Sequence, residues 1–385
     1  MATTSKKRGS CHSALGRPSK GALSTFDPQV AQVIKQVREK HSGWGAISIL
    51  DELGQCLPTS VRLPSIDSIN RYLKQAGLVF KYEPHGTFPR QKCQASTAAH
   101  DLWEMDAQGA VPVGGLGCQA MINIKDSHTR THCMAFPIPA RHQRCQPSRH
   151  HYQWALRLAF EEIGLPGGLQ VDKDSVFYEN MTKSPYPMPI HLWLVALGVK
   201  MCHVEVPPPQ KQSVVERSHQ TMERQALRGQ HYDTWKQLFD YCQKRRQRLN
   251  QHLPNRSLGK KSPWEAFPQA THSERPFSIE SEYDQLDPQR IYNLLAQGVW
   301  YRTLSSGKMV SLGRQRYYLK NANPGSQVQI TFDPLNQQFI FRHVNEQLIT
   351  QLPPKGISKE ELMGTTNAEL ILLKAKLLNS NEFTL

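Results

Sequence analysis

Three acidic residues in this 385-residue chain stand in contexts that suit metal-dependent chemistry. Asp106 ends the segment Leu-Trp-Glu-Met-Asp, Asp172 follows the strand-like run Leu-Gln-Val, and Glu216 begins Glu-Arg-Ser-His on an expected helix. Three carboxylates brought together can hold two Mg²⁺ ions, which activate an attacking oxygen and stabilise a leaving oxygen at one phosphodiester. We expect Mn²⁺ to substitute. These residue types therefore fit the cutting and joining of DNA.

Each carboxylate also has a purely structural interpretation. Asp106 or Asp172 alone could be a turn residue at the end of a strand. Ser213-x-x-Glu216 matches a capping box, in which Glu216 would bind the backbone of its own helix. Both roles need Glu216 at a helix start, so its position does not discriminate between them.

A mixed α/β pattern between residues 100 and 268 would position these carboxylates. Apolar residues recur at helical spacing from Tyr152 to Ile163 and predict a helix that buries one face. Ser213 begins a second, long helix, and the proline-rich stretch before it is interpreted as an inserted loop. Strands are predicted at 103–107, at 120–124, at 133–136 (stopped by Pro137 and Pro139), up to Asp172, and at 199–204.

The order of these carboxylates and elements resembles the Asp-Asp-Glu integrase core of retroviral integrases and bacterial insertion-sequence transposases. The resemblance implies an α/β ribonuclease-H-like fold. In that fold the first aspartate lies on the first strand, the second just after the fourth, and the glutamate on a nearby helix. It implies that Asp106, Asp172 and Glu216 are catalytic and hold two Mg²⁺ ions.

Two features depart from the family pattern. The family usually follows its second aspartate with Asn-Gly, where this chain has Lys173-Asp174. The gap between Asp172 and Glu216 holds 43 residues, which is longer than is common. Asp126 matches an aspartate that is structural in the family and is left out of the expected site.

Residues 26–80 are expected to form an all-α DNA-binding domain. Asp27-Pro28 starts a first helix, a second follows Gly43-Trp44-Gly45, and Ser65 caps a third over 65–76. The sequence pattern resembles the helix-turn-helix found ahead of integrase cores, with the third helix in the major groove. The alternative is an ordinary three-helix bundle whose polar face meets water. The third helix has an expected apolar face of Ile66, Ile69, Leu73 and Ala76.

Polar and basic side chains in three regions are candidate DNA contacts. Residues 1–25 form a basic flexible arm in which Gly16-Arg17-Pro18 resembles an AT-hook, although a plain tail is the alternative. Residues 81–99 form a basic linker. The residues around Glu216 are expected to contact phosphates or to support that carboxylate. The predicted DNA-binding residues are Arg17, Ser65, Ser68, Asn70, Arg71, Lys74, Lys211, Arg217 and His219.

The charge distribution agrees with a polyanion partner. The formal net charge is +15, and residues 1–100 carry 14 basic against 6 acidic side chains, whereas residues 269–385 carry 12 against 11. The first two-thirds of the chain would therefore face the nucleic acid. A solvated basic surface is the alternative.

The cysteines and histidines point away from zinc and disulfide frameworks. The eight cysteines are scattered and form no Cys-x-x-Cys pair. The histidines and cysteines between 128 and 151 have spacings that match no common zinc site. No apolar run reaches transmembrane length, so we expect no membrane and a cytoplasmic, nucleoid-associated protein.

The C-terminal part is expected to hold a small all-β barrel over 269–354 and a helical tail over 355–385. The barrel resembles the one that follows the core in Mu-type transposases. Leu370, Leu373 and Leu377 form an apolar stripe that is either a lid on the barrel or a docking tail. Strands are predicted at 299–302, 308–312, 316–319, 328–332 and 338–341, with a turn at 333–336.

The sequence thus predicts a multidomain DNA transposase whose ribonuclease-H-like core spans 100–268. It would bind element ends, free 3′-hydroxyls and join them to target DNA by two-metal phosphoryl transfer. Its partners would be double-stranded DNA and further copies of itself; the sequence leaves open an accessory ATPase or targeting protein. A catalytically silent integrase-like DNA-binding regulator is the alternative, and a nuclease without strand transfer is a third.

Overall fold

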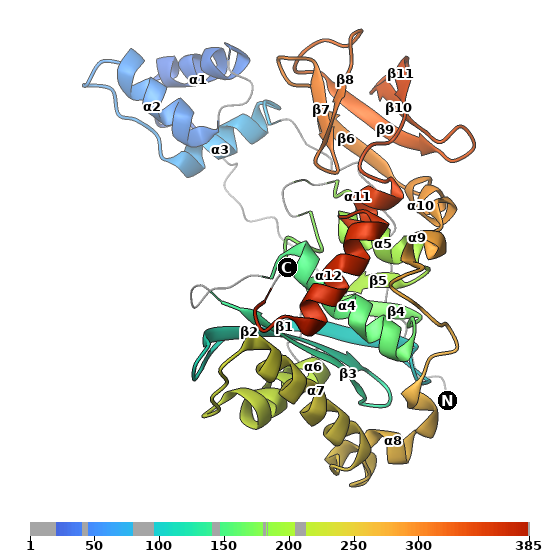
Figure 1. Cartoon of the computed structure of the whole chain (residues 1–385). Coiled ribbons are helices and arrows are strands. Elements are labelled where there is room, and N and C mark those ends of the chain that lie inside the picture. The colour runs from blue at the N-terminus through green and yellow to red at the C-terminus, as the bar shows by residue number, and fades with distance from the viewer. Residues whose placement is uncertain are drawn as a thin grey trace, which may run out of the picture. The chain divides into compact units, whose positions relative to one another are not determined.

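A computed structural model describes residues 21–40, 45–79, 96–140, 147–179, 182, 184–204 and 213–383. The chain divides into two compact units, residues 1–83 and residues 84–385 (Figure 1). The predicted contacts Arg17 and Lys211 lie outside the described residues, as do most of the expected linker and part of the proline-rich stretch.

The first unit contains the three predicted helices, α1 (Pro28–Lys40), α2 (Ala46–Cys56) and α3 (Ile66–Gln75). They enclose a small core of their own that includes Val30, Ile34, Ile49, Leu53 and Leu73. Within the described residues this unit is therefore helical with an apolar centre, as the spacing of its aliphatic residues predicts.

The buried face of α3 is rotated from the predicted one. Ile69 and Leu73 are buried as expected, but Ile66 is 40% exposed and Ser68 is buried instead. The side chain of Ser65 caps the helix by accepting the backbone N–H of Ser68, and the two hydroxyl oxygens are 3.0 Å apart. Ser68, which the sequence predicts as a DNA contact, is thus buried beside the helix cap.

The second unit is built on a five-stranded mixed sheet in the order β3-β2-β1-β4-β5. The first three strands pair antiparallel, whereas β4 pairs parallel with both β1 and β5. The strand, strand, strand, helix, strand order predicted for the core is confirmed. The elements are β1 (Leu102–Val113), β2 (Gly117–Asp126), β3 (His132–Pro139), α4 (Arg149–Ile163), β4 (Gly168–Val171), α5 (Pro189–Ala196), β5 (Lys200–His203), α6 (Ser213–Met222), the π-helical turn η2 (Glu223–Leu227) and α7 (Trp235–Gln251).

Two features of this sheet differ from the prediction. Strand β3 continues through Pro137 to Pro139, because it is an edge strand and the missing proline N–H groups break no inner ladder. Helix α5 occupies part of the stretch interpreted as an inserted loop, and Pro189 is in its first turn. A helix here supplies the crossover that parallel β4 and β5 require.

Alternation along β1 and β2 assigns their side chains to two faces of the sheet. Trp103, Met105, Ile122 and Ile124 pack with α4 and α5 in the main core. Figure 1 shows α4 and α5 on one side of the sheet and α6 on the other, with α7 following it. The opposite residues of β1, beginning with Glu104, therefore face α6.

His151 has a structural role at the start of α4, and most of the described cysteines are free. Ser148 and His151 form a capping box at the start of this helix, with Ser148 N donating to His151 Nδ1. Among the described cysteines, Cys56, Cys118, Cys133 and Cys242 are free, and Cys202 is disulfide-bonded.

The part after α7 contains a four-stranded antiparallel sheet in the order β11-β10-β9-β6 and a separate hairpin of β7 and β8. The five predicted strands are present and β11 is additional, but the described residues form no closed barrel. The elements are η3 (Arg256–Leu258), α8 (Pro263–Ala266), η4 (Pro268–Thr271), α9 (Glu282–Gln285), α10 (Pro288–Leu295), β6 (Val299–Thr303), β7 (Met309–Leu312), β8 (Gln315–Tyr318), β9 (Gln327–Asp333), β10 (Gln338–His343), β11 (Leu348–Leu352), α11 (Lys359–Met363) and α12 (Asn367–Asn379).

The C-terminal helix α12 packs on the core of its own chain. Leu370 and Leu377 are fully buried in the main core, and Leu373 packs against it. Lys374 Nζ lies 2.7 Å from Glu161 of α4. The apolar stripe is therefore occupied within the chain, which removes it as a free docking surface. No described helix has the length and apolarity needed to cross a membrane.

Candidate active site

Asp106 and Asp172 are brought together by the parallel pairing of β1 with β4. The register pairs Leu102 with Gly168 and Glu104 with Gln170. Two residues beyond this last pair, Asp106 lies within β1 and Asp172 directly follows the end of β4. Burial raises the pKa of Asp172, a hydrogen bond from Asp174 N lowers it, and the charge of Asp106 raises it again. The two carboxylates are thus within electrostatic reach of each other.

Asp106 is held in place by hydrogen bonds to both of its carboxylate oxygens. Its Oδ1 accepts the N–H of Ala107 at 2.8 Å, and its Oδ2 lies 3.2 Å from Nε2 of His219. The Nδ2 group of Asn123 lies 2.8 Å from Nδ1 of the same imidazole. Since an amide nitrogen only donates, Nδ1 accepts and Nε2 carries the proton that it donates to Asp106. His219, only 12% exposed, therefore supports the first carboxylate.

Three alternate residues of β1 contact residues of α6 and η2 that are four positions apart. Glu104 accepts from Val215 N at 3.3 Å, Asp106 pairs with His219, and Gln108 donates to Glu223 at 2.7 Å. Two strand residues rise about 6.6 Å and four helical residues about 6 Å, so the two repeats nearly match. This match fixes the height of α6 along β1 and hence the position of its first turn.

Glu216 lies in the first turn of α6 and is exposed. It precedes His219 by three residues, so the two side chains lie on the same flank of the helix, toward β1. However, no three His, Cys, Asp or Glu side chains of the described residues stand close enough together to hold a metal ion. The structure brings Asp106 and Asp172 together and leaves Glu216 apart from them.

The remaining predicted DNA contacts have different environments. Arg217 is exposed and directly follows Glu216 on α6. On α3, Asn70, Arg71 and Lys74 are exposed on one face, whereas the Ser65 side chain is engaged in the helix cap. The polar face predicted for α3 thus keeps these three residues.

Asp126 has the structural role expected from the resemblance. It is fully buried, and its carboxylate accepts the backbone N–H groups of His100, His128 and Thr129 at 2.6 to 2.8 Å. These bonds tie the turn after β2 to the segment that leads into β1.

Two supporting residues were missed from the sequence. Asn123 orients His219, and buried Glu104, whose pKa is raised by burial, accepts from Ser127 Oγ at 2.9 Å. A signal for Asn123 exists, because it is the polar residue in the apolar run 120–124. An amide in a buried strand needs a polar partner.

Comparisons with known proteins found no matching family model. Among solved structures, the chain is similar to the HTLV-2 integrase catalytic core domain in complex with magnesium, at 12% identity and a TM-score of 0.31, over 44% of this chain and 97% of that one. It is also similar to an intasome structure of simian T-cell lymphotropic virus, at 12% identity and a TM-score of 0.34, over 84% of this chain and 99% of that one. Identity and TM-score are low, so the functional conclusions rest on the residues of this chain.

Proposed function

We propose that this chain is a DNA transposase that cleaves the ends of a mobile element and joins the freed 3′-hydroxyls to target DNA. The observation that carries this proposal is the proximity of Asp106 on β1 to Asp172 directly after β4, where the charge of Asp106 acts on the Asp172 carboxyl and raises its pKa. Two neighbouring carboxylates, of which Asp106 is oriented by an imidazole, form the start of an oxygen-rich cation site. Glu216 is proposed as the third carboxylate.

The donor chemistry at this position fits a hard divalent cation. Asp106 and Asp172 offer carboxylate oxygens, and the raised pKa of Asp172 reflects burial together with a like charge that a cation would neutralise. Mg²⁺ or Mn²⁺ held by Asp106, Asp172 and Glu216 would supply the charge that activates an attacking oxygen and stabilises a leaving oxygen. The imidazole of His219 and the amide of Asn123 keep the Asp106 carboxylate oriented.

DNA recognition is proposed for the exposed face of α3. Asn70, Arg71 and Lys74 can reach base edges and phosphates if this helix enters the major groove, as in a helix-turn-helix. Because two ends must be joined in one reaction, more than one copy of the chain is expected on the DNA. The element is proposed to be a bacterial insertion sequence.

A catalytically silent DNA-binding regulator is the second candidate. It is favoured by the contact between His219 and Asp106, which engages one oxygen of the expected first metal ligand. In such a protein the bond would be a permanent part of the fold. In an active enzyme, Asp106 must bind the cation through the second lone pair of the oxygen that contacts His219, or through its other carboxylate oxygen.

The test uses labelled DNA from the two flanks of the gene, which would contain the element ends, and follows nicking and strand joining in Mg²⁺ and Mn²⁺. Asp106→Asn and Asp172→Asn should each abolish both reactions while DNA binding is retained, because recognition is assigned to the other unit. Asp240→Asn on α7 is the matched control, since it makes the same change at an exposed carboxylate that pairs with Lys236.

The outcomes separate the candidates. Wild-type cleavage that is lost in both site variants and kept in the control supports the transposase. Specific binding to the flanking DNA without any cleavage in either metal supports the silent regulator. Cleavage that persists in Asp172→Asn would remove the carboxylate pair from the mechanism.

A further inference from the structure

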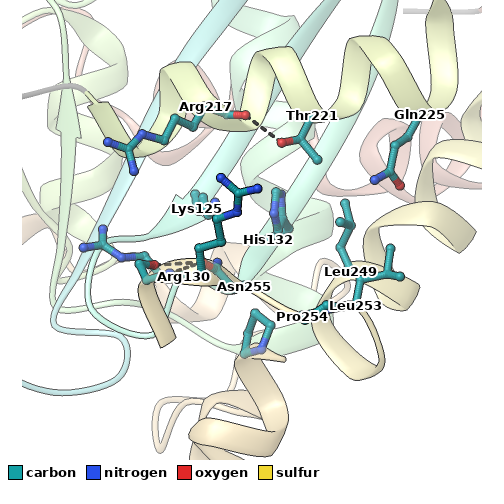
Figure 2. A pocket seen from close by; sticks show the side chains of 13 residues that line it. Lys125, Arg130, His132, Arg217, Thr221, Gln225, Leu249, Leu253, Pro254 and Asn255 are labelled. Carbon is teal, nitrogen blue, oxygen red and sulfur yellow. Dashed lines mark hydrogen bonds between the residues drawn. The ribbon is translucent and has the colours of Figure 1, made fainter. Parts of the chain in front are cut away.

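A basic pocket lies beside α6, on the flank that presents Arg217 and Thr221. Its volume is about 600 Å³, and none of its 13 lining residues is acidic. Figure 2 shows Lys125, Arg130 and Arg217 gathered at one end and the aliphatic residues Leu249 and Leu253 at the other. The basic lining residues are Lys125, Arg130, Arg217 and Arg256, with His132 in the wall.

Among the described residues, each buried arginine is bonded to a carboxylate, whereas buried Lys125 is not. Arg157 pairs with Glu282, Arg246 with Glu162, and Arg302 with Glu179, each within hydrogen-bonding distance. Lys125 is 6% exposed and makes no hydrogen bond or ion pair within the described part of the chain. Lys125 lines the pocket, and Glu104 is the carboxylate whose charge acts on its ammonium without bonding it, so an anion in the pocket would supply the direct pairing that this cation lacks.

The carboxylate nearest in register does not satisfy this ammonium. Glu104 is paired with Lys125 across β1 and β2, but its oxygens accept from Ser127 Oγ and Val215 N. Burial, with smaller contributions from the charges of Arg130 and Arg217 and against that of Glu104, lowers the pKa of Lys125 to about 8. Lys125 is therefore still mainly protonated at neutral pH.

The backbone of Arg130 and the side chain of His132 are held by hydrogen bonds within the chain. Arg130 follows the turn that Asp126 organises, and its own N–H donates to Asp126 O at 3.1 Å. His132 is buried and bonded to Ser218, and burial, with Lys125 and Arg246, holds its pKa well below the usual value. The imidazole is thus a neutral wall of the pocket, and the positive charge comes from the lysine and arginines.

The geometry points to a phosphate-binding pocket formed by Lys125, Arg130, Arg217 and Arg256, and we propose that it holds a backbone phosphate of the DNA strand. Guanidinium groups beside an ammonium are the donors that phosphate oxygens prefer.

The position of the pocket favours a DNA phosphate over a free one. Arg217 directly follows Glu216 on α6. Lys125 lies two residues along β2 from Asn123, which is roughly 7 Å along the strand, and Asn123 supports the His219–Asp106 contact. A strand that presents one phosphodiester to the carboxylates would therefore pass the pocket with a neighbouring phosphate. This assignment rests on the proposed function, because it assumes that DNA lies at the carboxylates.

The experiment measures binding of the full chain carrying Asp106→Asn to fluorescent duplex DNA as a function of salt, so that cleavage plays no part. Lys125→Met and Arg256→Gln should each lower affinity about tenfold and flatten the slope of log affinity against log salt by about one. Lys244→Met, an exposed lysine on α7, is the matched control and should change both much less. Arg256 is exposed, so its variant tests the pocket without changing a buried side chain.

A chemical double cycle identifies the ligand. Single methylphosphonate groups are placed along the DNA, one position at a time. At one position near the cleavage site, the neutral linkage should lower the DNA affinity of the parent protein but not that of Lys125→Met. An equal loss at every position for both proteins would overturn the assignment to a specific phosphate.

A second arm tests free phosphate. If pyrophosphate raises the melting temperature of the parent protein but not of Lys125→Met, while both bind DNA equally, the pocket serves a small phosphate compound and the DNA assignment is wrong. Pocket-dependent binding in a wild-type chain that never cuts DNA would contradict the proposed function alone. Cutting with unchanged binding in both pocket variants would contradict this inference alone.

Discussion

The two flanks of α6 differ in how their charged groups are satisfied. On the flank toward β1, Asp106 is bonded to His219 and the carboxamide of Gln108 to Glu223. On the other flank, the ammonium of Lys125 faces a pocket with no partner among the described residues. On the first flank the charged side chains have partners within the chain, and on the second flank we propose that an anion pairs with the lysine. A helix between two such flanks can place a cation and a phosphate at a fixed separation.

The largest effect should come from separate substitutions of the adjacent residues Glu216 and Arg217. Glu216→Gln should lower the cleavage rate by about 10²–10³-fold, because a carboxylate that stabilises charge at the reacting phosphate is lost. Its DNA affinity should hardly change. Arg217→Gln should do the reverse, with weaker binding and a nearly unchanged rate on saturating DNA. Single-turnover kinetics with binding isotherms measure both, and equal effects of the two variants would erase the difference between the flanks.

Lys125 predicts an unusual dependence of stability on pH. Burial lowers its pKa to about 8 in the folded chain, against the usual 10.5, with Arg130, Glu104, Cys133 and Arg217 facing it. Between these two values the unfolded chain holds the proton and the folded chain releases it, so folding stability rises with pH.

Lys125→Met removes this penalty at neutral pH. It should be up to about 3 kcal/mol more stable than wild type at pH 7, and the difference should fade as the pH rises through 8 toward 10.5. Urea unfolding at both ends of this range tests the prediction. If the difference in unfolding free energy between the two proteins does not depend on pH, Lys125 is not a buried, charged lysine.

His219 should tune the carboxylate flank more modestly. His219→Ala removes the N–H that orients Asp106 and should weaken Mn²⁺ binding by about 10–100-fold. His219→Gln keeps an N–H donor and should restore most of the affinity. Calorimetric titration of Mn²⁺ distinguishes them. If both variants bind Mn²⁺ as wild type does, the imidazole has no part in the cation site.

The smallest effects should come from α3, which lies in the other unit. Arg71→Ala and Lys74→Ala should lower affinity for the element ends by about 1–3 kcal/mol where a base is read, and alike on all sequences where only phosphate is touched. Lys35→Ala, on an exposed part of α1, is the control. Losses that add to those of Arg217→Gln would confirm that the two DNA contacts are independent.

The sequence predicted the elements with strong periodicity and missed those without it. α4 and the central strands were predicted because their apolar residues alternate or recur at 3.6-residue spacing. Helix α5 is apolar on nearly every side and surrounded by prolines, so it shows no such period. On α3, Ile66 is exposed although the sequence predicted it to be buried, and Ser68 is buried beside the Ser65 cap although it was predicted to be exposed.

Part of the candidate site could not be predicted from the sequence either. Asp106 and Asp172 could be predicted, since each ends or follows a recognisable strand. The pocket could not, because Lys125, Arg130, Arg217 and Arg256 come from separate elements and only the packing of α6 on β2 gathers them. No local pattern marks a lysine that will lose its partners on folding.

The most direct test of the account is a crystal structure of the chain with Mn²⁺ and end DNA, in which anomalous scattering locates the metal. The account predicts Mn²⁺ bound between the carboxylates of Asp106 and Asp172, with Glu216 turned toward it and a DNA phosphate beside Lys125. Mn²⁺ absent from the carboxylate pair while DNA occupies the complex would contradict it.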